Sequence, residues 1–189
     1  MAVYAAAPAD CRSLADFFAY CLRQFDIRFR WWLDVANIDA DITDEILFDD
    51  NTLPGFNDSG ADITNLAFYD CNLLNLQIAQ RTGLNKVAIA VKRLTRDPAE
   101  FFNLDVGGLE PGEQADLVLI NPEPLKLYDS NKNRQLVYNP AFEHDVLVNR
   151  SDGVVEQVYI RGVRIWESAS QFTEALGQQT LGRALTAAR

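Results

Sequence analysis

The spacing of apolar residues in the first half of the chain predicts helices. From Leu14 to Phe25, apolar positions recur every three or four residues and form one face, and Ser13 is a suitable N-cap. A short helix is predicted over 43–48. Apolar stripes from Leu66 to Leu76 and from Leu84 to Leu94 predict two longer helices. The first half is therefore expected to be mainly helical.

Two segments of this half carry other signals. In residues 27–35, every second position is apolar, which is the period of a strand. These positions are Ile27, Phe29, Trp31, Leu33 and Val35. Asp97-Pro98 predicts a helix start, with Asp97 as N-cap, Pro98 in the first turn and Glu100 completing a capping box. That helix is expected to stop before Gly107-Gly108.

The second half is patterned for strands. Residues 115–120 form a short apolar run, and 146–148 form another. The segments 154–160 and 163–166, separated by Arg161-Gly162, predict a hairpin. Glu110-Pro111-Gly112-Glu113 favours a type II turn. Residues 122–143 are polar and contain three prolines, so a loop is predicted there.

Composition narrows the classes of partner. The 189 residues are 48% hydrophobic, as in folded globular proteins, and the net charge is −10. A negative chain of this kind argues against nucleic acid and against an anionic membrane surface, because both require a basic face. Three cysteines without a C-x-x-C pattern are expected to be reduced thiols. With neither a signal peptide nor an apolar run of roughly 20 residues, the expected location is the cytoplasm.

Several motifs then resemble one family. The runs LPGFNDSGADITNLAFYDCNLLNLQIAQ, VKRLTRDPAEFFNLDVGGLEPGEQADLVLINP and VNRSDGVVEQVYIRGVRIW follow one another in this order. Together with LGQQTLGRAL, they resemble the C-terminal part of a metal-dependent amidohydrolase. FNDSGAD and NLAFYD point to the N-acyl-D-amino-acid deacylase (D-aminoacylase-like) branch. The resemblance covers residues 29–189.

The resemblance implies an α/β plus β architecture. Residues 1–104 would be the last strands and helices of a (β/α)8 barrel, and residues 105–189 would be strands of a small β-sandwich. Leu53–Asp58 would be the final barrel strand, with Asp58 at the catalytic end of the barrel. In the family, the aspartate at this place takes a proton from metal-bound water and passes it to the leaving amine.

Two departures from the family change this picture. Asp62 stands where the family usually has His. A zinc site of this type also needs several imidazoles, whereas the chain has one histidine, His144, in the strand-patterned half. Zinc is thus the cofactor that the family implies, but the chain alone is expected to hold no metal. His144 is interpreted as a surface histidine.

Alternatives remain for the other polar candidates. Asp58 is also a suitable Asx-turn residue, and Asp62 a suitable helix N-cap. Arg30 and Asn37 are candidates for binding a substrate carboxylate, although an exposed strand arginine is the commoner situation.

The leading hypothesis is hydrolysis of an amide C–N bond in an N-acyl amino acid, by a chain that is incomplete alone. A complementary N-terminal polypeptide or a homo-oligomer would complete it. The competing hypothesis is a non-catalytic binding or scaffold protein.

Overall fold

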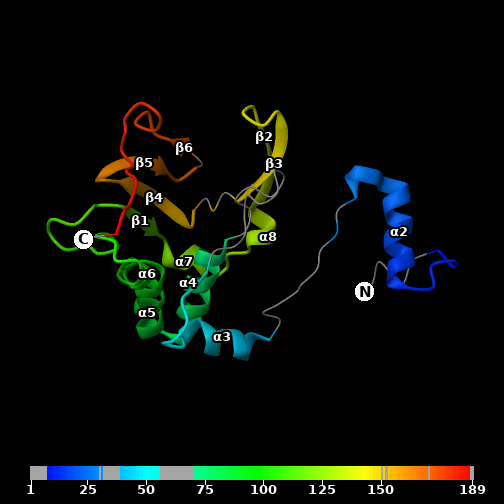
Figure 1. Ribbon diagram of the computed structural model, residues 1–189, viewed down its shortest axis with the longest axis horizontal. Coiled ribbons are helices and arrows are strands. Elements are labelled where there is room, and N and C mark those ends of the chain that lie inside the picture. The colour runs from blue at the N-terminus through cyan, green and yellow to red at the C-terminus, as the bar shows by residue number, and fades with distance from the viewer. Residues whose placement is uncertain are drawn as a thin grey trace. The chain divides into compact units, whose positions relative to one another are not determined.

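The computed structural model describes residues 8–29, 31, 39–55, 70–149, 151, 153–169 and 171–187 (Figure 1). The chain divides into two compact units, Met1–Ala40 and Asp41–Arg189. The predicted boundary between residues 104 and 105 stays a prediction about family architecture. No described helix is both long and apolar enough to cross a membrane.

The first unit is built on the predicted amphipathic helix. Helix α2 spans Leu14–Phe25, and the Ser13 hydroxyl accepts a hydrogen bond from the Asp16 amide at 3.1 Å, which confirms the N-cap. A 3₁₀ turn, η1 (Asp26–Arg28), follows, because Asp26 takes a φ of +48° and ends the helix. The strand predicted from residue 27 is therefore wrong at its start. Arg30 and residues 32–38 lie outside the described residues.

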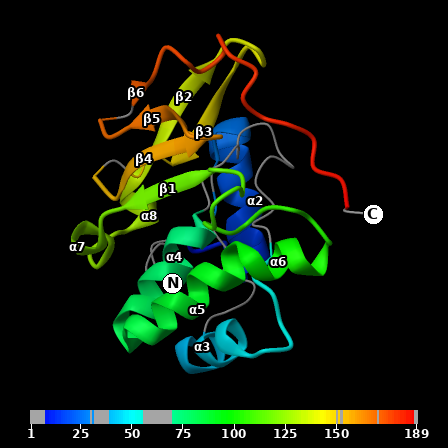
Figure 2. The same ribbon diagram turned by 90° about the vertical axis from the view of Figure 1, so that its left-hand side faces the viewer.

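The second unit begins with four helices, α3 (Ala40–Phe48), α4 (Cys71–Thr82), α5 (Leu84–Leu94) and α6 (Arg96–Phe101). Figure 2 shows α4 and α5 side by side, with α3 beyond α5. Their buried side chains form one cluster with residues from the second half: Leu73, Leu76, Ala79, Ala90, Leu125, Tyr128 and Val154. The predicted helices over 43–48 and 84–94 are confirmed, and so is the described part of the helix predicted from Leu66. Its first residues, to Tyr69, are outside the described residues.

The start of α6 differs from the prediction. The helix begins at Arg96, one residue before the expected N-cap Asp97. The Asp97 carboxylate instead pairs with Lys92 at 2.7 Å, and Glu100 pairs with Arg96 at 2.9 Å. Both carboxylates therefore pair with nearby cations and do not accept hydrogen bonds from the backbone amides, as a capping box would require. The helix also ends earlier than predicted, at Phe101.

Two antiparallel sheets follow. One has the strand order β1-β4-β5-β6, with bounds Leu117–Ile120, Val155–Ile160, Val163–Glu167 and Gln171–Phe172. The other pairs β2 (Arg134–Asn139) with β3 (His144–Asn149). The predicted hairpin is confirmed, because β4 and β5 pair across Arg161-Gly162, whose φ angles of +50° and +78° suit a type I′ turn. The predicted β-sandwich is not established by these two sheets.

The predicted loop over 122–143 is wrong. It contains two short helices, α7 (Pro122–Leu125) and α8 (Ser130–Asn133), and the whole of β2. The side chains of Asn121 and Asp129 accept amide hydrogen bonds at 3.1 and 3.0 Å and cap the two helices. Two of the three prolines, Pro122 and Pro124, lie instead in the first turn of α7, where a missing amide proton costs little, and Pro140 directly follows the end of β2.

Substitution of Gly107 tests a close backbone approach. Gly107 has φ +86°, and a Cβ there would lie 2.7 Å from the Thr95 carbonyl oxygen. Gly177 has a similar φ of +78° but nothing within 4 Å of its would-be Cβ. We expect Gly107→Ala to lower the free energy of unfolding by about 2 kcal/mol more than Gly177→Ala, because only the first adds a clash to the backbone strain. Urea unfolding of both variants measures the difference, and equal losses would contradict the approach of residue 107 to α6.

Candidate functional site

The predicted site residues lie outside the described part of the structure. Asp58 and Asp62 fall within residues 56–69, Arg30 is a single undescribed residue, and Asn37 falls within residues 32–38. The structure therefore leaves their predicted roles untested. It does describe the residues on both sides of 56–69, and these are held by side chains of α4, α5 and the α7 region.

The approach to residue 56 is anchored by Arg93 on α5. Its guanidinium is buried, with 5% of the residue exposed. Nη1 donates to the Asp49 carbonyl at 2.7 Å, and Nη2 donates to both the carbonyl and the hydroxyl of Thr52, the latter at 2.9 Å. Only Leu53, Pro54 and Gly55 separate Thr52 from residue 56.

The chain after residue 69 is anchored by Asp70. One carboxylate oxygen accepts a hydrogen bond from the Leu73 amide at 3.4 Å and caps α4, while the other accepts from the Tyr128 hydroxyl at 2.5 Å. Tyr128 is 6% exposed. Burial raises the pKa of Tyr128 well above its usual range, and the hydrogen bond and negative charge of Asp70 raise it further. The phenol therefore stays a donor to Asp70 at neutral pH.

Gln77 in turn fixes the backbone around Tyr128. Its side-chain amide nitrogen donates to the carbonyls of Leu125 at 2.9 Å and Tyr128 at 2.8 Å. Its amide oxygen accepts from Arg81 at 3.1 Å. Gln77 is buried, so these bonds satisfy carbonyls that water does not reach. Both flanks of residues 56–69 are thus tied to the α4–α5 pair.

The residues present do not fit a zinc centre of the kind that the resemblance implies. The chain has a single histidine, and His144 is exposed at the start of β3. Within the described residues, no group of three or more His, Cys, Asp or Glu is placed to hold a metal ion. Zinc sites of hydrolases use imidazole nitrogen or thiolate sulfur as donors, together with carboxylate oxygen. His144 at the surface agrees with the prediction made for it.

Two of the cysteines, Cys11 and Cys71, are poor candidates for a reactive thiolate. Burial raises the pKa of Cys71, and the neighbouring Asp70 carboxylate raises it further. Partial desolvation also raises the pKa of Cys11, with Asp10 and Asp16 acting in the same direction. A raised pKa keeps a thiol protonated at neutral pH, which disfavours both nucleophilic attack and metal binding.

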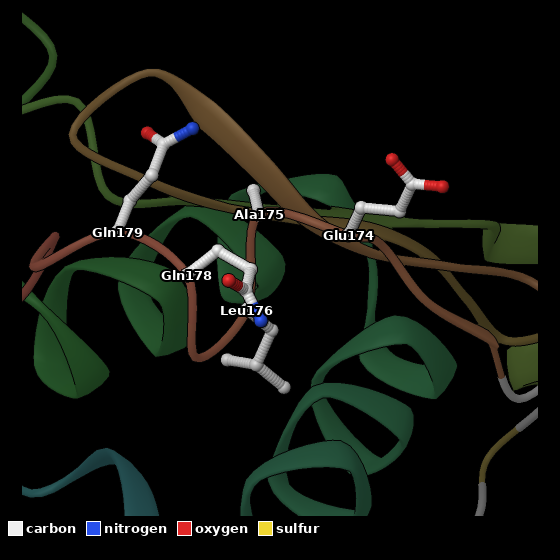
Figure 3. A pocket seen from close by; sticks show the side chains of 5 residues that line it. All are labelled: Glu174, Ala175, Leu176, Gln178 and Gln179. Carbon is white, nitrogen blue, oxygen red and sulfur yellow. The ribbon is translucent and has the colours of Figure 1, made fainter.

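A hollow lies on the C-terminal segment, remote in sequence from residues 56–69. It is lined by Glu174, Ala175, Leu176, Gln178 and Gln179 (Figure 3). Figure 3 shows Leu176 pointing toward the helices and Glu174 pointing to the opposite side. A single carboxylate among amides and alkyl groups provides no acid–base pair. This hollow therefore carries no assignment of catalysis.

Sequence reasoning missed four of the anchoring residues. Asp70 precedes an apolar helical run and carried a recognisable N-cap signal. Arg93 has no such signal, because it lies within an apolar helix pattern and its partners are 41 and 44 residues away. Tyr128 lay within the segment predicted as loop. Gln77 also has no local signal, since its carbonyl partners lie 48 and 51 residues further along the chain.

Comparison with known proteins gives one family. A model described as the amidohydrolase family matches residues 43–165, about two thirds of the chain. Uncharacterised proteins of Mycobacterium bovis and Mycobacterium tuberculosis are 31% identical over 158 residues, which cover 79% of this chain. The match covers 26% of each relative, so the chain spans about a quarter of their length. No solved structure gives a significant match.

The anchor at Asp70 is expected to be sensitive to high pH. The pKa of Tyr128 is raised in the folded state above its ordinary value of 10.0, so the folded state holds the phenolic proton more tightly than the unfolded state. Its contribution to stability is full below pH 10 and is lost as the pH rises further. We expect Tyr128→Phe to lose about 1–3 kcal/mol at neutral pH, because a hydrogen bond to a charged group is removed.

Urea unfolding between about pH 8 and pH 11 measures this effect. The stability advantage of the wild type over Tyr128→Phe should shrink above pH 10. The control is Tyr138→Phe, since Tyr138 is 59% exposed on β2 and should show little change at any pH. An advantage that stays constant to pH 11 would contradict the assignment.

Proposed function

The chain belongs to the amidohydrolase family, and on that basis we propose that it takes part in hydrolysis of an amide C–N bond, with an N-acyl amino acid as substrate. The observation that carries the proposal is the family match over residues 43–165, which includes the FNDSGAD motif. The deacylase branch is proposed from that motif and from NLAFYD. Preference for the D-configuration belongs to the same proposal.

Asp58 is the proposed proton carrier. In the reaction, a water oxygen forms a bond to the amide carbon, the C–N bond breaks, and the products are a carboxylic acid and an amine. A carboxylate beside the water would accept its proton and then deliver it to the leaving nitrogen. Arg30 and Asn37 are proposed to bind the substrate carboxylate, for which an arginine fork is suited.

The donor set indicates that other groups complete the site. One exposed histidine cannot supply the imidazoles of a zinc centre, so no step is assigned to a metal held by this chain. We propose that a complementary N-terminal polypeptide or another copy of the chain provides them. In this arrangement the helices to residue 104 belong to a (β/α)8 barrel and the strands after it to a β-sandwich. Cytoplasmic location remains a prediction.

The shortage of imidazole ligands also supports a second candidate function. A family member without metal ligands could be a binding or scaffold protein that retains the fold and lacks the chemistry. The two candidates differ in what the chain does when the missing residues are supplied.

Metal content and turnover separate the candidates. We expect the purified chain to hold well below one zinc per molecule and to leave N-acetyl-D-methionine intact, because its donors are insufficient. Mixing it with the part of the mycobacterial relative that the match leaves out should produce amine release. Stoichiometric zinc with turnover by the chain alone would overturn the proposed incompleteness. A complex that binds zinc and shows no turnover would favour the scaffold function.

Substitution of Asp58 tests its role in the mixture. Asp58→Asn should lower kcat by about 10²–10⁴-fold, since a general base is lost while the side-chain size is kept. Asp105→Asn, on the chain after α6, is the matched control and should leave kcat unchanged. Equal effects of the two substitutions on amine release would remove Asp58 from the proposed mechanism.

A further inference from the structure

The two sheets of the second unit differ in how their edges are protected. In the four-stranded sheet, edge strand β6 has two residues, and edge strand β1 has four and shifts register against β4 between Leu119 and Ile120. Short or irregular edges resist pairing with another chain. The β2–β3 ribbon has six residues in each strand and pairs without a register shift. The sequence of β2, RQLVYN, also lacks the proline and lysine that commonly protect an edge.

β2 is the exposed strand of this ribbon. Within the described residues it pairs with β3 alone, so its outer edge has no neighbouring strand there (Figure 1). Leu136 and Tyr138 of β2 are 60% and 59% exposed. β3 is packed on one face, because Val146 and Val148 are buried. A two-stranded ribbon is only marginally stable in water, and added strands on the open edge of β2 would stabilise it.

The side chains of the ribbon alternate between an inner and an outer face. Val146 of β3 and the opposite Val137 of β2 lie on the inner face. Leu136 and Tyr138 lie on the outer face, and Leu136 is opposite Leu147. The outer face therefore presents apolar side chains directly beside the open edge.

The ribbon carries charges of opposite sign at its two ends. Arg134 begins β2, whereas Glu143 and Asp145 lie at the other end, in the turn and near the start of β3. All three residues are exposed. Antiparallel pairing of two β2 strands brings the basic end of each copy to the acidic end of the other, while parallel pairing would bring like charges together. Charge complementarity of this kind sets orientation more than affinity.

We propose that the open edge of β2 is a dimerisation surface, which pairs antiparallel with β2 of a second copy of the chain. The two-fold axis passes through Leu136, and the product is a four-stranded sheet in the order β3-β2-β2-β3. Leu136 then faces its own copy, and Arg134 faces Tyr138 of the second copy on the same outer face. The inference goes beyond the proposed reaction and does not depend on it.

The alternative registers are less favourable. An axis between two residues would place the outer face of one copy beside the inner face of the other. An axis through Val137 would place Pro140 opposite Arg134, and a proline has no amide proton to donate to the ladder. The axis through Leu136 keeps the apolar face continuous and leaves Pro140 outside the paired residues.

Analytical ultracentrifugation of the full chain tests the edge. A single edge of this length is a small interface, so we expect reversible dimerisation at roughly 10–100 µM. Leu136→Lys should weaken dimerisation about tenfold or more, because the symmetric interface then holds two ammonium groups opposite each other. Val118→Lys is the matched control, since Val118 is 56% exposed on edge strand β1 of the other sheet. It should leave dimerisation unchanged.

Oxidation of introduced cysteines tests the register without the lysine variant. Opposite Cα atoms in an antiparallel pair are about 4.5–5.5 Å apart, within the range of a disulfide, whereas diagonal neighbours are about 7–8 Å apart. Leu136→Cys should therefore give a disulfide-linked dimer, and Val137→Cys should not. The wild type, oxidised in parallel, controls for the native cysteines.

Several results would overturn the proposal. One is a chain that stays monomeric at about 100 µM, including a monomer whose β2 edge binds the remaining part of the mycobacterial relative and loses that complex in Leu136→Lys. Another is a dimer that Val118→Lys dissociates and Leu136→Lys does not. Cross-linking of Val137→Cys in place of Leu136→Cys would overturn the register. Far-UV circular dichroism checks that Leu136→Lys is folded, and if it is not, the two cysteine variants decide.

Discussion

Packing of α4 against α5 is the interaction on which the described part of the second unit depends. Ala79 on α4 and Ala90 on α5 have no exposed surface, and both belong to the buried cluster that Leu73 and Leu76 extend. Small side chains at such positions let two helices approach closely. Val154, at the start of the strand pair, joins the same cluster. The helix pair thereby connects residues from both halves of the chain.

Polar side chains of this pair then bind residues that flank the undescribed stretch 56–69. Gln77 binds the carbonyls around Tyr128, and Arg93 binds the turn that ends in Thr52. Each side chain donates hydrogen bonds to backbone carbonyls that would otherwise be buried without a partner. Tyr128 completes the arrangement through Asp70. The described residues on both sides of 56–69 are consequently held by long-range hydrogen bonds.

The fold could be predicted from sequence where the signal was local. The helices around Leu14–Phe25 and Leu84–Leu94 follow from their apolar period, and the hairpin turn follows from Arg161-Gly162. Prediction failed where side chains had competing partners. Asp97 is a good N-cap in isolation, but Lys92 lies within reach of its carboxylate. The prolines after Asn121 indicated a loop, although the same residues begin a helix once Asn121 caps it.

The sequence by itself determined the family, because motifs such as FNDSGAD keep their order and spacing whatever surrounds them, and from the same motif it predicts Asp58 as the catalytic residue. It also determined the shortage of imidazole ligands, since a count of histidines needs no coordinates. Only the tertiary structure decided that Arg93, Tyr128 and Gln77 hold the flanks of that motif. Their partners are 41 to 58 residues distant in the chain. Contacts over such separations arise from helix packing, which no local pattern of residues encodes.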